Sequence, residues 1–302
     1  MEKGRSRVWK KTVIAAVLAL GLIAIGCATA SLVTDDGLFE YQVRQSIGTK
    51  AVYITKYLGT ETEIVIPDQL DGFEVWGIFS RGGYLENSGG NVVGMFEGKS
   101  LTSVIFPKNL LTVEMRAFAK NNLTNVTLPN NVSLGQSVFA ENPITSFTLG
   151  TDIKCYSNSL NTLTPYYYGN NKLAGKYTLD GDTWKFNGSA VNLPAIIRTT
   201  NAEGGLSLTI VALNDTKFSM LNTNPYEMGR IQNGREYWLP AGTHALSIAK
   251  AESRGAGISI DSVGPSAVIR GDFKAGTIYM FREKADKSGI EYAEMGAWTP
   301  PK

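Results

Sequence analysis

The sequence predicts a mainly β protein in which a short solenoid precedes an antiparallel β-sandwich. Two observations carry this prediction. A unit of the chain recurs within residues 101–150 at spacings of 22 and then 21 residues, and such a period is typical of stacked coils. From Ala190 onward the repeat is replaced by short stretches in which apolar and polar residues alternate, and turn residues separate these stretches. Short strands at such spacing are typical of a sandwich.

The first 30 residues have the three parts of a secretory signal peptide: a basic start, an apolar run and a small-residue end. The apolar run covers residues 12–26, and Ala28-Thr29-Ala30 follows it. We therefore expect export to the cell envelope, either to its outer surface or to the periplasm.

Three interpretations of this leader remain open. One is cleavage after Ala30, because small residues precede that bond. Another is cleavage before Cys27, because Ala24-Ile25-Gly26-Cys27 resembles a lipoprotein box in which Cys27 carries the lipid. An uncleaved membrane anchor is the third, because apolar residues continue through Val33 and about 20 of them span a bilayer. We prefer lipidation at Cys27, since an exported cysteine beside an apolar run otherwise needs a special explanation.

The charge balance argues against a nucleic-acid partner. The chain has a formal net charge of +2, but its leader holds five basic residues and one acidic residue. Without the leader, 24 basic and 26 acidic residues remain. A bulk charge of this size gives no obvious attraction to nucleic acid or to anionic lipid.

Each repeating unit begins with a short strand that turns one face inward. Leu101-Thr-Ser-Val-Ile-Phe-Pro107 returns as Leu123-Thr-Asn-Val-Thr-Leu-Pro129 and as Ile144-Thr-Ser-Phe-Thr-Leu-Gly150. Large apolar residues occupy positions 1, 4 and 6 of each copy, which leaves positions 3 and 5 for the outward face. The outward positions form the predicted binding face: Ser103, Ile105, Asn125, Thr127, Ser146 and Thr148.

The rest of the unit repeats as well. Phe118 and Phe139 occupy equivalent positions, and Phe96 is an earlier counterpart. We expect each ring to fill the core of one coil. Asn121 and Asn142 precede the next strand, where a side-chain amide can bond backbone groups left unpaired at a turn.

An earlier copy of the strand carries an insertion behind it. Thr62-Glu-Ile-Val-Ile-Pro67 ends 40 residues before Pro107, about twice the repeat length. The Gly-rich stretch at residues 80–94 is the expected position of the insertion and the expected mobile element.

Leu-Thr-Ser-Val-x-x-Pro, followed by a variable stretch and Ala-Phe, resembles the BspA-like leucine-rich repeats, which are common in bacterial surface proteins. Phe39-Glu-Tyr and Ile66-Pro67-Asp-Gln-Leu-Asp-Gly72 are similar to that family's entry segment. The resemblance implies a leucine-rich-repeat domain over residues 38–164. It also implies an adhesin-like role in which the repeat sheet binds host or neighbouring-cell proteins. The repeat residues specify packing and do not name a ligand.

Residues 165–189 are aromatic and turn-rich. An open solenoid end exposes apolar core and an unpaired strand edge, so a closing element is required. The segment resembles the terminal Ala-Gly-x-Tyr-Thr hairpin with a following Trp that closes the last coil in spirochaetal relatives of the repeat family. The other interpretation is a sugar-stacking platform made of Tyr166, Tyr167, Tyr168 and Trp184. We prefer the cap, because the need for a cap is certain and the need for a ligand is not.

Residues 190–298 form the predicted sandwich. Short alternating stretches lie at residues 206–213, 236–239, 244–248, 257–261, 267–273 and 277–281. Turns such as Pro240-Ala-Gly242 and Lys274-Ala-Gly276 separate them. These turns also resemble those of small sandwich modules in bacterial envelope lipoproteins, a group without a single known function.

We predict no catalytic residue, no cofactor and no metal site, and therefore expect a protein that is not an enzyme. His244 is the one histidine, and the absence of a nucleophile motif near it favours a structural role at a strand start. Cys155 is interpreted as a small buried hydrophobe in preference to a reactive thiol. The acidic pairs at residues 35–36 and 180–182 lack the alternating oxygen ligands of a calcium loop.

Together these features predict an exported, adhesin-like interaction protein of the cell envelope, held at the membrane by its signal segment or a lipid. Its expected partners are host or bacterial surface proteins. The alternative is a periplasmic scaffold or a carbohydrate-binding protein that acts through the C-terminal sandwich. The predicted segments are a leader over residues 1–30, repeats over 38–164, a capping hairpin over 165–189 and a sandwich over 190–298.

Overall fold

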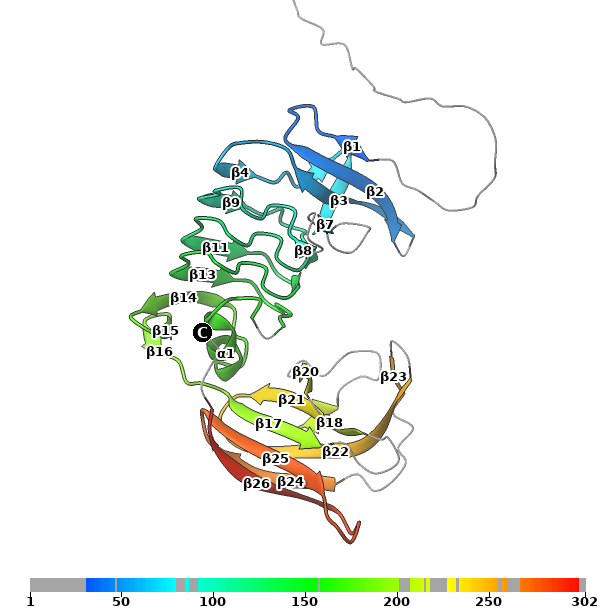
Figure 1. Cartoon of the computed structure of the whole chain (residues 1–302), viewed down its shortest axis with the longest axis vertical. Helices are drawn as coiled ribbons and strands as arrows, with labels where there is room; N and C mark the ends of the chain where they lie inside the picture. Colours follow the sequence, from blue (N-terminus) through cyan, green and yellow to red (C-terminus); the bar gives the residue numbers. More distant parts are fainter. Residues whose placement is uncertain are drawn as a thin grey trace, which may run out of the picture.

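The computed structural model shows a solenoid and a sandwich arranged along the long axis of the molecule (Figure 1). Most of its elements are strands, which confirms the predicted mainly β class. It describes residues 31–46, 48–79, 85–86, 92–156, 158–200, 207–214, 216–217, 227–231, 234–254, 257–259 and 267–298. The leader with Cys27 lies outside the described residues, as does most of the insertion at 80–94. Within that insertion, β7 (Leu85–Glu86) pairs with β8 (Val92–Val93).

One face of the solenoid is built from the strands of the repeating unit. β4 (Glu63–Val65) pairs in parallel with β9 (Ser103–Ile105), and β11 (Asn125–Leu128) pairs in parallel with β13 (Ser146–Leu149). The four strands lie one above the other in Figure 1. Burial alternates along β11, with its apolar residues inside and its polar residues outside. This alternation follows from the pleat, which sends successive side chains to opposite faces of a sheet.

The opposite face joins the coils to an N-terminal hairpin. Its antiparallel part consists of β1 (Leu32–Val33), β2 (Phe39–Ser46) and β3 (Thr49–Tyr57). Parallel pairing continues from β3 through β6 (Phe73–Ile78) and β10 (Thr112–Val113) to β12 (Ser133–Leu134). The short β5 (Gln69–Leu70) pairs with β6. The apolar core lies between this sheet and the repeat strands.

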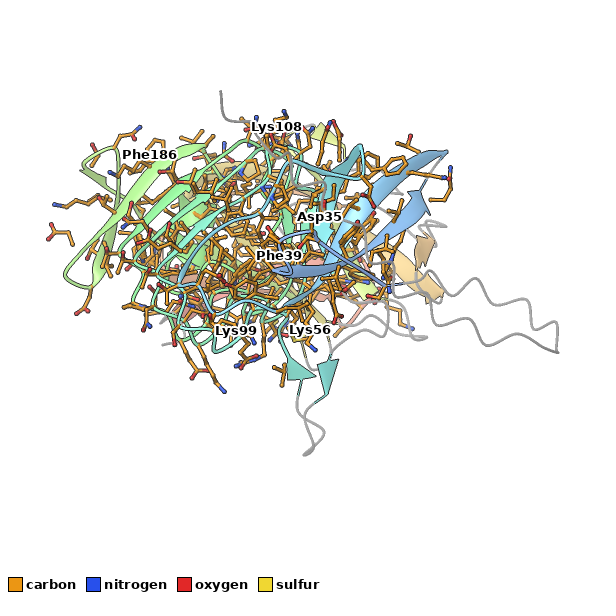
Figure 2. All side chains as sticks on the ribbon, turned by 90° about the horizontal axis from the view of Figure 1, so that it is seen from above. Asp35, Phe39, Lys56, Lys99, Lys108 and Phe186 are labelled. Atoms are coloured by element: carbon orange, nitrogen blue, oxygen red, sulfur yellow. The ribbon has the colours of Figure 1, made fainter. Side chains whose placement is uncertain are left out.

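The hairpin closes the first coil of the solenoid. Phe39 and Tyr57 are fully buried, their ring centroids lie 5.7 Å apart, and both belong to the solenoid core. Seen from above, Phe39 lies between Lys108 and Lys99 (Figure 2). A bare solenoid end would leave apolar core in contact with water, so such a cover is required.

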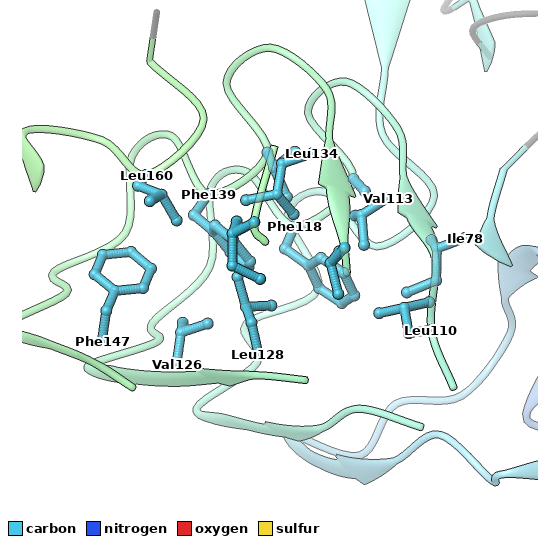
Figure 3. Close-up of a cluster of buried hydrophobic side chains, with 14 of the residues drawn as sticks. Ile78, Leu110, Val113, Phe118, Val126, Leu128, Leu134, Phe139, Phe147 and Leu160 are labelled. Carbon is cyan, nitrogen blue, oxygen red and sulfur yellow. The ribbon is translucent and has the colours of Figure 1, made fainter. Parts of the chain in front are cut away.

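A stack of aromatic rings fills the solenoid along its axis. Phe96, Phe118 and Phe139 come from successive coils and are fully buried. Their ring centroids lie 4.7 and 5.9 Å apart, and the ring planes differ by 21° and 19°. Tyr57 extends the stack, 5.5 Å from Phe96. Figure 3 shows Phe118 and Phe139 within the surrounding apolar core. Each unit therefore contributes one ring to the core, as the sequence predicts.

Two asparagines join neighbouring coils from inside the turns. The Asn121 amide donates to three backbone carbonyl oxygens, including that of Phe96 in the preceding coil, and its own carbonyl oxygen accepts two backbone N–H groups. Asn142 repeats the arrangement one coil later, donating to the carbonyl oxygen of Phe118 at 2.8 Å and accepting the N–H of Leu123 at 3.0 Å. Each buried backbone group left without a partner would cost about 1–3 kcal/mol. The predicted role of both side chains is confirmed.

Two glycines lie where successive coils touch. A Cβ atom on Gly94 would lie 1.9 Å from the carbonyl oxygen of Arg116, and one on Gly135 would lie 2.4 Å from the backbone nitrogen of Met115. Both contacts involve backbone, which cannot move aside without displacing a coil. Only glycine fits at these positions.

The last coil is closed by a short helix and a hairpin. After α1 (Leu163–Gly169), β14 (Gly175–Asp180) pairs antiparallel with β13 and leads into β15 (Thr183–Phe186) and β16 (Ser189–Ala190). The sequence predicts the hairpin but not the helix that precedes it. Pro165 is compatible with α1 because it lies in the first turn, where backbone N–H groups have no helical partner. No helix among the described residues is long and apolar enough to cross a membrane.

The C-terminal domain consists of two facing sheets. The first has the order β20 (Glu227–Ile231), β21 (Gly234–Leu239), β17 (Ala195–Thr200), β25 (Thr277–Glu283) and β26 (Ile290–Ala297). The second has the order β19 (Thr216–Lys217), β18 (Ser207–Leu213), β22 (Gly242–Arg254) and β23 (Gly257–Ser259), with β24 (Ala267–Phe273) also beside β22. Pairing is antiparallel except between β17 and β25, which are parallel.

Four strands of this domain were not predicted, namely β17, β19, β20 and β26. β17 is central in its sheet and largely buried. A strand covered on both faces shows a continuous apolar or β-branched run and lacks the alternation on which the prediction depended.

The solenoid and the sandwich are in direct contact. The ring of Tyr168 in α1 lies 5.9 Å from that of Trp238 in β21, and Trp298 lies 5.0 Å from Trp238. Ile196 and Trp238 belong to the same apolar cluster as the solenoid core. The two domains are therefore packed together by aromatic side chains in addition to being joined by the chain.

A mostly buried carboxylate links the coils by charge. Glu97 lies 2.6 Å from Arg116 and 3.3 Å from Lys120, and Arg116 also reaches Glu141 at 3.4 Å. Burial alone would raise the pKa of Glu97. Hydrogen bonds from Arg116 and from the N–H of Gly94, together with the positive charge of Arg116, outweigh burial and lower this pKa.

Replacing Phe118 with Ala should lower the free energy of unfolding by about 3–5 kcal/mol, because it empties the middle of the ring stack. Urea unfolding followed by tryptophan fluorescence measures this change. Leu111→Ala is the matched control, since this apolar side chain is 41% exposed and its loss should change the stability by less than about 0.5 kcal/mol. Equal stability of Phe118→Ala and wild type would contradict the ring stack.

Stability should also depend on pH through Glu97. Because the folded-state pKa is lowered from 4.5, the contribution of Glu97 is present above that value and is lost as the pH falls through the folded-state pKa. Glu97→Gln should melt at a lower temperature than wild type at neutral pH, and the difference should shrink on acidification. Glu141→Gln, at an exposed carboxylate, should show less of both effects. Melting curves at a series of pH values measure this, and a difference that stays constant with pH would contradict the assignment.

Candidate binding face

The outward side chains of five neighbouring strands form two columns. The strands are β4, β9, β11, β13 and β14. The first column consists of Glu63, Ser103, Asn125, Ser146 and Thr178. The second column consists of Val65, Ile105, Thr127, Thr148 and Lys176. We call these two columns together the repeat face.

The second column is the more exposed of the two. Val65 and Ile105, which lie opposite each other in the register, expose 61% and 59% of their surface. Thr127, Thr148 and Lys176 are exposed as well. The structure therefore exposes three of the six predicted positions on neighbouring strands. Thr127 and Thr148 lie opposite each other in the register of β11 and β13, whereas β9, which carries Ile105, contacts β11 without pairing with it.

The first column differs from the prediction at its later strands. Asn125 is exposed and Ser103 is half-buried, as an outward position allows. Ser146, however, is only 9% exposed, although its place in the unit predicts an outward side chain. Thr178 on the closing strand β14 lies opposite Ser146. The repeat period cannot reveal this neighbour, because β14 runs antiparallel to the repeats.

Threonine side chains beside the face tie consecutive strands together. The hydroxyl of Thr102 donates to the carbonyl oxygen of Thr62 at 3.2 Å, and that of Thr145 donates to the carbonyl oxygen of Thr124 at 3.4 Å. The same carbonyl oxygens also accept backbone N–H groups of the later strand. These bonds hold the strands in register and so keep the two columns straight.

Charge is confined to the ends of the repeat face. Glu63 begins the first column and Lys176 ends the second. Neither forms an ion pair with another residue in the described part of the chain. Beyond the face, Lys185 on β15 is already paired with Asp180 at 2.5 Å. The middle of the face is uncharged.

Sequence reasoning missed two members of the second column. Val65 would have been found by aligning residues 62–67 with residues 102–107, because it occupies the position of Ile105. Lys176 gives no such signal, because β14 runs antiparallel to the repeats and lies outside their period.

The predicted aromatic patch belongs to the core. Tyr167, Tyr168 and Trp184 are 0%, 2% and 1% exposed, and Tyr166 is half-buried. Trp184 packs 5.8 Å from the ring of Phe147, at the end of the solenoid. These rings cover apolar surface that the last coil would otherwise expose. A sugar-stacking platform at this place is therefore wrong, because the ring faces are not accessible.

The interior of the cap shifts the pKa values of three titratable side chains away from their usual values. Burial raises the pKa of the Cys155 thiol to about 12, although the charge of Lys172 acts against it. Burial also raises the pKa of Tyr177 to about 12 and lowers that of Lys172. A thiol with such a pKa holds almost no thiolate at neutral pH, and the thiolate is the reactive form. Cys155 therefore packs as an apolar residue.

His244 also has a structural place. Its Nε2 atom lies 2.7 Å from the carbonyl oxygen of Pro240, and its Nδ1 atom lies 3.1 Å from the side-chain amide of Asn214. Both ring nitrogens thus have partners between a turn and a strand. Within the described ranges, no group of three or more His, Cys, Asp or Glu residues is arranged to hold a metal ion. Cys27, the predicted lipidation site, lies outside these ranges.

Comparison with known proteins gives one family and one structural relative. Residues 93–173 match the BspA type leucine rich repeat region, with 6 copies of the repeat. A leucine-rich repeat protein of T. pallidum is similar in structure, with 18% sequence identity and a TM-score of 0.20. That similarity covers 39% of this chain and 66% of the other, so just under two thirds of the relative is matched. No curated protein matches the chain.

Proposed function

We propose that this chain, whose residues 93–173 match the BspA type leucine rich repeat region, is an exported cell-envelope protein that binds other proteins through the repeat face. Repeats of this kind serve protein–protein interaction in general, because a stack of coils presents an extended surface. The adhesin-like role, the export and the lipid anchor are the specific parts of the proposal.

The open repeat face is the observation that supports this function most. Val65 and Ile105 expose adjacent apolar side chains. Polar side chains lie beside them, namely Ser103 and the charged Glu63 in the first column and Thr127 in the second. Exposed apolar surface rimmed by polar residues marks contact surfaces on proteins. We propose binding without catalysis, since His244 and Cys155 both serve the packing of the fold.

The proposed anchor at Cys27 would hold the N-terminal hairpin beside the membrane. Three residues separate Cys27 from Ser31, the first described residue, and an extended chain spans at most about 3.6 Å per residue. The sandwich lies at the opposite end of the molecule (Figure 1). In this arrangement the later coils and the sandwich extend away from the membrane, where host or neighbouring-cell proteins would meet them.

Protease treatment of intact cells, combined with labelled-lipid incorporation, tests the location. We expect the protease to degrade the protein and the lipid label to be lost in Cys27→Ala. The matched control is Cys155→Ala, which should keep the label. Protection from the protease in intact cells, with degradation after the envelope is opened, would instead support a periplasmic scaffold and contradict the adhesin role.

Adherence of cells to surfaces coated with host or neighbouring-cell proteins tests the binding. Thr127→Arg places a long charged side chain in the middle of the repeat face and should lower adherence at least about tenfold, equivalent to about 1.4 kcal/mol. Thr243→Arg is the matched control, because Thr243 is another exposed strand threonine but lies in the sandwich. Both variants should retain the wild-type melting temperature. If Thr243→Arg lowers adherence and Thr127→Arg does not, the sandwich and not the repeat face carries the binding.

A further inference from the structure

We propose that the repeat face binds an extended segment of a partner protein, with an apolar side chain at one end of the segment and an acidic side chain four to six residues away. This inference rests on the proposed function and adds to it the chemistry of the partner. It follows from the distribution of apolar and charged residues along the second column.

The apolar end of the face is formed by Val65 and Ile105. They lie opposite each other on β4 and β9, and each exposes more than half of its surface. The later members of the column, Thr127 and Thr148, carry a hydroxyl in place of a methyl group. Covering the two apolar side chains with another apolar side chain removes them from water, which is favourable in proportion to the area covered. An apolar anchor of the partner is therefore expected at this end and not in the middle.

The cationic end of the face is formed by Lys176. Its side chain is exposed on β14 and has no ion-pair partner among the described residues. The next basic residue along the sheet, Lys185, is already paired with Asp180. Lys176 is thus the available positive charge of the face, and a carboxylate is its complement.

Glu63 fixes the orientation of the segment. It lies in the first column at the apolar end, two residues from Val65 on the same strand. An acidic residue beside the apolar anchor would meet the like charge of Glu63, which is unfavourable. The acidic residue of the partner is therefore directed toward Lys176, at the opposite end.

The spacing of the strands sets the length of the motif. Paired strands lie about 4.8 Å apart, and β9 and β11 are in contact without pairing. With a similar step between those two strands, Lys176 is about 14 Å from Ile105, three strands away, and about 19 Å from Val65, four strands away. An extended chain advances about 3.3 Å per residue. A segment that crosses the strands therefore covers the distance in four to six residues. Thr127 and Thr148 lie under its middle, where short hydroxyl side chains let a backbone approach.

The size of the face favours a single segment over a second copy of the chain. Two columns across five strands cover about 20 by 10 Å, which is about 200 Å². A stable interface between two folded proteins buries about 800 Å² on each partner. The face is too small for that but matches the width of one extended chain.

Selection from a phage-displayed library of random 12-residue peptides tests this inference. The target is the full-length protein, purified in detergent and immobilised. We expect enriched peptides to contain an apolar residue and an Asp or Glu four to six positions away. Fluorescence anisotropy with the enriched peptide should show at least about tenfold weaker binding to Lys176→Glu and to Ile105→Ser. A peptide with Lys in place of its acidic residue should regain affinity for Lys176→Glu, because the charges are then opposite again.

The controls separate this inference from the function on which it rests. Lys99→Glu reverses an exposed charge outside the repeat face and should leave peptide binding unchanged. Peptides whose binding is abolished by Thr127→Arg but which lack the motif, or keep their acidic preference on Lys176→Glu, would overturn the inference and leave the proposed function intact. If no enriched peptide is sensitive to Thr127→Arg, both the use of this face and the inference are wrong.

Discussion

The packing of Phe96, Phe118 and Phe139 along the solenoid axis is the constraint on which the rest of the structure depends. The ring centroids lie 4.7 and 5.9 Å apart, the first close to the spacing of adjacent strands, about 4.8 Å, and the second about 1 Å larger. One ring per coil therefore lets coils approach closely enough for their strands to pair, as β4 does with β9 and β11 does with β13. The asparagine in each turn then bonds the backbone beside the ring, and glycine stands where backbone approaches backbone.

A stacked core has two ends, and both must be covered. Tyr57 and Phe39 close the first end, and Trp184 with the tyrosines of the cap closes the second. At the second end the apolar contact continues through Tyr168 to Trp238, so that the sandwich is packed on the cap. The demand for burial explains why an aromatic-rich segment serves the core and is not available to a ligand.

The same stacking creates the surface. Because each unit places its outward side chains at the same two positions, differences among the units become differences along a column. Val65 and Ile105 make one end apolar, and Lys176, supplied by the closing strand, makes the other end cationic. A regular core thus carries an irregular face, and the proposed selection of a partner depends on that irregularity.

The amino-acid sequence alone was sufficient to predict the mainly β class, the repeat register, the buried phenylalanine rings and the hydrogen bonds of the asparagine side chains. Each of these features depends on contacts that recur with the repeat period. The sequence was also sufficient to place Ile105, Thr127 and Thr148 on one face. The burial of Ser146, the addition of Lys176 to the column and the burial of Trp184 depend on an antiparallel strand that returns from outside the repeats. β17 was not predicted, because apolar and polar residues do not alternate along a strand that is buried on both faces. These features depend on contacts between segments that no period relates, and only the folded chain brings such segments together.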